Sequence, residues 1–149
     1  ALVPNLSDNG DYDGADDSNW TIDTGDIDDW TINTNTSSSF SATKNGTDSG
    51  DLKLYFSSAN SELSSNLTVG QVYKLTYTLA TTGTLPSWQK RLLNGALSTN
   101  LVVGTNIIYF RAESATSIRI QFRSNTNGEN FTLSNVNIEP VNGNPGELK

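Results

Sequence analysis

Histidine, cysteine and methionine are all absent from this sequence. Without the first two, the chain lacks the most common catalytic base, a thiolate nucleophile and the usual zinc ligands. It has no GxxxxGK[ST] loop to bind phosphate, and its five Glu are scattered along the chain. Its Asp residues gather in turn-like sequence rather than in a carboxylate pair placed for glycoside hydrolysis. We therefore expect no enzymatic activity and no required cofactor.

Long hydrophobic runs are absent as well. No basic start is followed by the apolar stretch of a signal peptide, and nothing approaches the ~20 apolar residues of a membrane span. We therefore expect no membrane partner. The chain starts with Ala1, as a short gene product does once its initiator Met is trimmed, although a cleaved secretory precursor would look the same. Its 149 residues suffice for one domain with a core that needs no disulfide.

Charge is unevenly distributed along the chain. Residues 1–51 hold all eleven Asp and a single base, Lys44, for a net charge of −10, while residues 52–149 carry a net +3. Two explanations of this uneven charge stay open. The charge serves solubility alone, or the acidic region binds cations or a basic partner surface. Nucleic acid is not an expected partner, because no basic patch dominates the sequence.

Apolar and polar residues alternate with a period of two along most of the chain, and helical periodicity is nearly absent. In the stretch 72–79, every second residue is large and apolar, namely Tyr73, Leu75, Tyr77 and Leu79. The stretches 52–56 and 118–122 follow the same alternation, and Asn-Gly turn signals separate such runs. The pattern predicts an all-β fold, a single β-sandwich of jelly-roll type with roughly eight to ten antiparallel strands. We assign the sandwich to residues 1–140 and an extended C-terminal tail to residues 141–149.

Two further stretches are interpreted as strands. The sequence TNIIYFRA, residues 105–112, is apolar on both faces, which predicts a central strand that is covered on both sides. The sequence SELSSNLTV, residues 61–69, alternates with a period of two as far as Val69.

The last predicted strand contains a break in its alternation. The pair Phe131 and Leu133 is out of step by one residue with the pair Val136 and Ile138. A β-bulge at Ser134–Asn135 would restore the register, because one extra residue returns both pairs to the same face.

Two of the three tryptophans begin a repeated phrase, Trp20-Thr-Ile-Asp and Trp30-Thr-Ile-Asn, ten residues apart. Either ring would suit an exposed platform that stacks on a ligand. However, Ile22 and Ile32 keep step with the two rings, and a face shared with isoleucine favours burial. We expect Trp20 and Trp30 to anchor an N-terminal hairpin to the core, with the acidic turn between them exposed.

The segment NGDYDGADD resembles half of a calcium-binding loop. Its spacing matches the Asx-x-Asp-x-Asp-Gly start of such a loop, since Ca²⁺ takes six to eight hard oxygens around a tight turn. Position twelve of the loop, however, is Trp20 instead of an acid. A Ca²⁺ site and a solvated acidic loop therefore both stay open, and the candidate ligands are Asn9, Asp11, Asp13, Asp16 and Asp17.

A candidate glycan site comes from Trp88 and from polar positions of the predicted strands. Trp88 lies in LPSWQKR, where core patterning is weak, and glycan sites place flat aromatic rings beside polar groups. The alternation turns a set of polar side chains away from the core, namely Lys53, Tyr55, Lys74, Arg119, Gln121 and Arg123. The candidate glycan-binding residues are Trp88, Gln89, Arg91, Tyr55, Arg119, Gln121 and Arg123. The alternatives are an ordinary solvated face and a basic face that contacts the acidic N-terminal region of a neighbouring copy.

The order of these segments resembles a known family. LVPN…NW, LSSNLTVGQVYKLTYTLA, IRIQF and a closing FTLSNVNI follow one another as in the carbohydrate-binding-module 4/9-type jelly roll of the galactose-binding-like superfamily. Such domains are appendages of glycoside hydrolases, and similar ones recur in phage virion proteins. The most specific element is L-x-x-G-x-x-Y-x-L-x-Y, at Leu67, Gly70, Tyr73, Leu75 and Tyr77.

One departure from the family concerns calcium. Enzyme-attached members usually close with Leu-Asp-Asp-Val, whose carboxylate helps to hold a structural calcium ion. The matching residues are Leu133, Ser134, Asn135 and Val136, an ending that resembles the phage-type domains and leaves no carboxylate there.

The resemblance implies a binding or structural module without catalysis. We expect a virion structural protein, a phage capsid decoration or tail component, whose partners are other virion proteins or further copies of itself. The alternative is a secreted, extracellular carbohydrate-binding module that acts beside a polysaccharide-degrading enzyme and binds glycans. Ca²⁺ is the one cofactor that either role leaves open.

Overall fold

The computed structural model describes residues 21–22, 27–36, 39–55 and 66–141. These residues form ten strands and one short 3-10 helix, and no helix among them has the length and apolarity to cross a membrane. The elements are β1 (Thr21–Ile22), η1 (Ile27–Asp29), β2 (Trp30–Asn35), β3 (Ser39–Lys44), β4 (Gly50–Tyr55), β5 (Val72–Ala80), β6 (Gln89–Asn94), β7 (Leu97–Asn100), β8 (Gly104–Arg111), β9 (Ile118–Ser124) and β10 (Asn130–Pro140).

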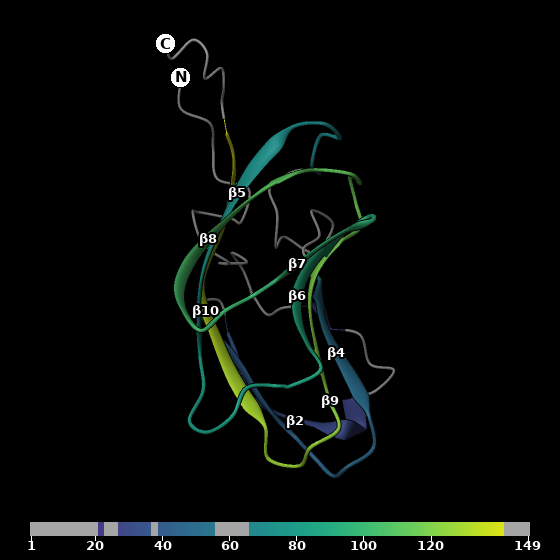
Figure 1. Cartoon of the computed structure of the whole chain (residues 1–149), viewed down its shortest axis with the longest axis vertical. Helices are drawn as coiled ribbons and strands as arrows, with labels where there is room; N and C mark the ends of the chain where they lie inside the picture. The colour runs from purple at the N-terminus through teal and green to yellow at the C-terminus, as the bar shows by residue number, and fades with distance from the viewer. Residues whose placement is uncertain (1–20, 23–26, 37–38, 56–65, 142–149) are drawn as a thin grey trace.

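The strands form two five-stranded antiparallel sheets that face each other as two layers (Figure 1). Sheet A has the order β1-β4-β9-β6-β7, and sheet B has the order β2-β3-β10-β5-β8. The chain crosses between the layers several times, which is how a jelly roll covers the inner face of each sheet with the other. The expected all-β sandwich is confirmed.

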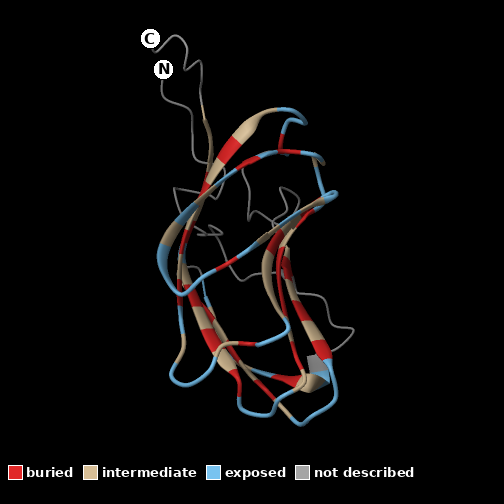
Figure 2. Cartoon of the chain, viewed as in Figure 1, coloured by how far each residue is buried: buried red, intermediate tan, exposed pale blue. Residues whose placement is uncertain are grey.

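The core lies between the sheets, and buried residues alternate with less buried ones along strands such as β4 and β5 (Figure 2). An aromatic cluster occupies its centre. Phe122 of sheet A stacks on Phe131 of sheet B with ring centroids 3.7 Å apart, and Phe40 and Trp30 also contact Phe131. The inward positions that the alternation predicts in 72–79 and 118–122 are all buried.

The N-terminal hairpin expected from the two tryptophan phrases is wrong. β1 pairs with β4 in sheet A, whereas β2 pairs with β3 in sheet B, so the phrases continue into different layers. The expected burial of Trp30 is confirmed, with 3% of its surface exposed. Trp20 lies outside the described residues.

The interpretation of TNIIYFRA as a central strand is also wrong. Among the described strands β8 lies at the edge of sheet B, and the side chains of Ile107 and Tyr109 on its outer face are 50% and 62% exposed. Apolar residues on both faces of this strand therefore do not mean that both faces are covered. In the stretch 61–69, the described part begins at Asn66 and is not a strand; Leu67 is buried, but Val69 is exposed.

The β-bulge in β10 is confirmed. The pairing of β10 with β5 shifts register between Ser134 and Asn137, and Asn135 adopts a positive φ of 53°. Asn tolerates this left-handed conformation better than most residues with a side chain. The extra residue lets Leu133 and Val136 both point into the core.

Candidate functional site

The polar side chains of β4, β9 and β6 lie on one surface, which we call the outer face of sheet A. They point away from the core because the alternate residues of the same strands, such as Leu54, Ile120 and Leu92, are fully buried between the sheets. The strand register arranges them in three cross-strand rows: Asp51 with Arg123 and Gln89; Lys53 with Gln121 and Arg91; Tyr55 with Arg119 and Leu93.

The described rows of this face carry an excess of positive charge, although the whole chain has a net charge of −7. The rows bring four cationic side chains together with one carboxylate, that of Asp51. They come from three strands that are far apart in the sequence, so the folded sheet concentrates basic residues that the sequence disperses.

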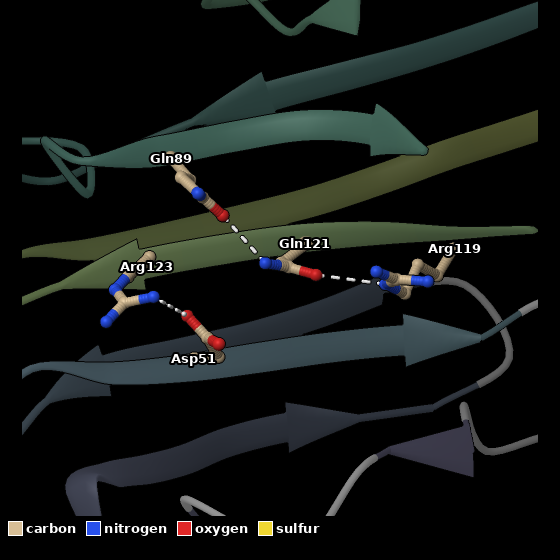
Figure 3. A network of polar contacts seen from close by, with 5 residues as sticks. All are labelled: Asp51, Gln89, Arg119, Gln121 and Arg123. Carbon is tan, nitrogen blue, oxygen red and sulfur yellow. Dashed lines mark hydrogen bonds and ion pairs between the residues drawn. The ribbon is translucent and has the colours of Figure 1, made fainter. Parts of the chain in front are cut away.

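A chain of hydrogen bonds orients the centre of the face (Figure 3). Arg119 Nε donates to Gln121 Oε1 at 2.9 Å, and Gln121 Nε2 donates to Gln89 Oε1 at 2.7 Å. Gln121 is only 7% exposed, so its amide lies beneath the longer side chains. Because the Gln89 oxygen accepts from Gln121, the Gln89 amide nitrogen remains a donor for an incoming group.

Trp88 extends the face at the start of β6. Its ring is 50% exposed and lies beside the Arg123 guanidinium, whose Cζ is 5.4 Å from the ring centroid. The Trp88 backbone amide also donates to the Arg123 carbonyl at 3.2 Å. On its other side Arg123 approaches Asp51, with Nη1 3.5 Å from the carboxylate (Figure 3). The guanidinium therefore links the aromatic ring to the polar rows.

A buried carboxylate holds the loop that carries Trp88. Glu129 is 6% exposed, and its Oε1 accepts hydrogen bonds from the Ser87 amide, the Ser87 hydroxyl and the Ser124 hydroxyl, at 2.9, 3.1 and 2.6 Å. Ser124 follows Arg123 directly, so Glu129 fixes both neighbours of the Trp88–Arg123 contact. Nothing in the sequence marks Glu129, because an acid in an Asn-Gly-Glu turn gives no signal of burial.

The structure brings all seven candidate glycan-binding residues to the outer face of sheet A or to its end, where Trp88 lies. Lys53 shares this face. Lys74 does not: it belongs to β5 in sheet B, where it pairs with Glu139 and Tyr109, so grouping it with the others was wrong. Equal alternation in two strands cannot reveal that they lie in different sheets.

The predicted calcium ligands, Asn9 to Asp17, lie outside the described residues, so that site stays a prediction. In the described ranges, no cluster of three or more acidic residues could hold a metal ion. At the position of the missing family carboxylate, the Asn135 amide instead donates to the Thr78 hydroxyl at 3.3 Å.

No protein-family model matches this chain, and no curated protein does. Among solved structures, the chain is similar to the enzymatically active domain of bacteriophage CBA120 tailspike protein 4, with 15% sequence identity and a TM-score of 0.54. That match covers 92% of this chain and 21% of the tailspike chain, so this chain spans about a fifth of its length.

A second match is the structure described as "BiXyn10A CBM1 APO", with 10% identity and a TM-score of 0.44 over 96% of this chain and 91% of that one. A score this low supports no inference. The tailspike likeness, at low identity, shows the fold alone: this β-sandwich is similar to one found within a phage tail protein.

Proposed function

We propose that this chain is a non-catalytic structural protein of a phage particle, a capsid decoration or tail component, and that it binds a glycan on the outer face of sheet A. The observation that carries the binding role is the assembly of an exposed ring, amide groups and guanidinium groups on one surface. The expected resemblance to carbohydrate-binding jelly rolls supports the same role.

The chemistry of this face suits a sugar. The half-exposed ring of Trp88 offers a flat apolar surface for the faces of pyranose rings. The amide of Gln89 and the guanidinium of Arg119 offer donors for hydroxyl and ring oxygens, and the buried contacts of Gln121 hold both in place before a ligand arrives. A pre-oriented set of donors beside a ring lowers the ordering cost of binding.

The structural role in a virion is supported by β8. This edge strand exposes Ile107 and Tyr109, and the loop before it exposes Val102 and Val103. An eight-residue edge strand with exposed apolar side chains is a surface that soluble proteins normally cover or interrupt. A neighbouring subunit in a particle would cover it. The fold likeness to a tailspike domain agrees with this setting.

Two experiments test the two parts separately. A glycan array probed with the wild-type protein should give specific binding that Trp88→Ala abolishes, whereas Tyr109→Ala, an exposed aromatic on the other sheet, should leave it intact. Binding that survives Trp88→Ala but fails in Tyr109→Ala would place the ligand elsewhere and refute the proposed face.

Light scattering over a concentration series tests the structural role. The wild-type chain should form a defined oligomer, or bind phage particles that lack it, and the double variant Ile107→Thr/Tyr109→Thr should lose that association while keeping its fold. Trp88→Ala is the matched control and should associate normally. If the wild-type chain associates and the double variant associates equally well, β8 is not the association surface.

The second candidate function is a carbohydrate-binding module that acts beside an extracellular polysaccharide-degrading enzyme. The Trp88 ring and the polar rows of the outer face of sheet A favour this function too, because they can bind a glycan without a partner protein. Under this function the chain is a monomer at all concentrations, does not bind phage particles and still loses glycan binding on Trp88→Ala. The two experiments above therefore distinguish the candidates.

A further inference from the structure

We propose that the ligand of the outer face of sheet A is an anionic oligosaccharide, a glycan that carries carboxylate or sulfate groups. In this account Arg91, Arg119 and Arg123 bind its negative groups while Trp88 stacks on a sugar ring. The proposal rests on the glycan-binding part of the proposed function and names the class of glycan.

The balance of charge on the face is the first argument. Four cationic side chains lie in its three rows with one carboxylate, and Asp51 contacts Arg123. A neutral sugar needs donors but no excess of positive charge. The guanidinium fork, in contrast, matches the two oxygens of a carboxylate or sulfate, and three of the four cationic residues are arginines.

Several guanidinium nitrogens of this face have no hydrogen-bond acceptor within the described residues. The Nε atoms of Arg91 and Arg123 are buried and make no hydrogen bond within the described residues. Arg119 uses Nε to contact Gln121, and the part of the chain that the structure describes offers its terminal nitrogens no hydrogen bond. The buried Nε atoms are closed to solvent, so a ligand acceptor would meet the terminal nitrogens instead. Arg91 Nη1 already donates to Ser98 Oγ at 3.2 Å, which leaves Arg119 with the most donors for a ligand.

The groups on this face are also combined and spaced in a way that suits an oligosaccharide. Arg119 and Arg123 are four residues apart on β9, so their backbones are ~13 Å apart along the strand, a span longer than one sugar ring. Trp88 lies at the Arg123 end of this span, and the Gln89 amide lies between the two arginines and can meet hydroxyl groups. An acidic peptide would use the charges but has no need of the ring.

Calorimetric titration with matched pairs of glycans tests the proposal. Oligogalacturonide is compared with its methyl ester for the carboxylate arm, and dextran sulfate with dextran for the sulfate arm. We expect the charged member of at least one pair to bind at least about tenfold more tightly than its neutral counterpart. Which pair responds identifies the anionic group.

Variants then assign the effect to residues. Arg119→Gln and Arg91→Gln should each weaken binding of the charged glycan by about tenfold or more, and Arg119→Lys should lose affinity because it keeps the charge without the fork. Lys74→Gln removes the same charge from sheet B and should change affinity less than about twofold. Circular dichroism of each variant confirms that the fold is retained.

Three outcomes would overturn the proposal. Equal affinity for charged and neutral glycans, still lost in Trp88→Ala, would refute the anionic class but leave the proposed glycan-binding function standing. Failure of every glycan on the array and in titration would refute both. Equal binding of polyaspartate and of the charged glycans, insensitive to Trp88→Ala, would identify a general anion surface that contacts an acidic protein.

Discussion

The Trp88 ring lies beside the Arg123 guanidinium, 5.4 Å from centroid to Cζ, and the Trp88 amide donates to the Arg123 carbonyl. This pair joins the end of one strand to the start of another, and it holds an aromatic ring at the solvent boundary in a fixed position. The Trp88 ring is half exposed and contacts the protein on one side, whereas the Trp30 ring is buried in the core.

The contrast between the two tryptophans gives the first prediction. Trp30→Ala should lower the free energy of unfolding by about 3–5 kcal/mol, because it leaves a cavity beside Phe131. Trp88→Ala should lower it by no more than about 1 kcal/mol, the range of an exposed cation–π contact. Urea unfolding of both variants measures this. A Trp88 variant as unstable as the Trp30 variant would show that Trp88 belongs to the core.

Glu129 provides a prediction about positioning. Glu129→Ala removes the acceptor of three hydrogen bonds, so we expect a loss of about 2–4 kcal/mol in stability. Glu129→Gln keeps an oxygen acceptor and should lose less.

The effect of Glu129 on the site is separable from its effect on stability. If Glu129 positions Trp88, the indole N–H resonance of Trp88 should shift in Glu129→Gln, and glycan affinity should fall several-fold in a protein that is still folded. Glu113→Gln, an exposed carboxylate, is the control. An unchanged resonance and unchanged affinity would limit Glu129 to a structural role.

Asn94 is buried and uses its whole amide. Its Nδ2 donates to the carbonyls of Ser114 and Ser117 at 3.0 and 2.8 Å, and its Oδ1 accepts from the Glu113 amide at 2.7 Å. Asn94→Asp should cost about 2–4 kcal/mol, because a carboxylate oxygen would replace the donor and face two carbonyl oxygens. Thermal and urea unfolding measure the loss. Asn100→Asp, an exposed position on β7, should change stability by less than about 0.5 kcal/mol; equal effects at both positions would contradict this account.

The bulge at Asn135 gives the last prediction. Its φ of 53° penalises a β-branched side chain, so Asn135→Val should cost about 1–3 kcal/mol, whereas Asn135→Gly should stay close to the wild-type stability. Differential scanning calorimetry of the two variants measures these changes in stability. A stable valine variant would mean that the bulge relaxes to another register.

Strands β5 and β9 and the bulge in β10 could be predicted because each depends on local alternation, which these segments carry plainly. Tyr55, Arg119, Gln121 and Arg123 on the outer face of sheet A could be named for the same reason, whereas Gln89 and Arg91 were named as neighbours of Trp88. Their grouping was partly wrong, because Lys74 alternates in the same way but lies in the other sheet. Which strands are neighbours is decided by the packing of whole layers, and period-two alternation carries no information about it.

The edge position of β8 illustrates the same limit. Ile107 and Tyr109 look like core residues in the sequence, but β8 is the last described strand of sheet B and their side chains lie exposed on its outer face. Buried polar groups were equally hidden: Glu129 and Asn94 are satisfied by partners that come together only in the folded loops.

The central claim, a glycan-binding surface on the outer face of sheet A, is tested most directly by NMR. The ¹⁵N-labelled protein would be titrated with the charged and neutral glycans, while the side-chain resonances of Trp88, Gln89, Gln121 and Arg119 are followed. We expect the chemical-shift changes to concentrate on these groups and to saturate with the charged ligand. Shifts confined to β8 and sheet B, or no shifts with any glycan, would contradict it.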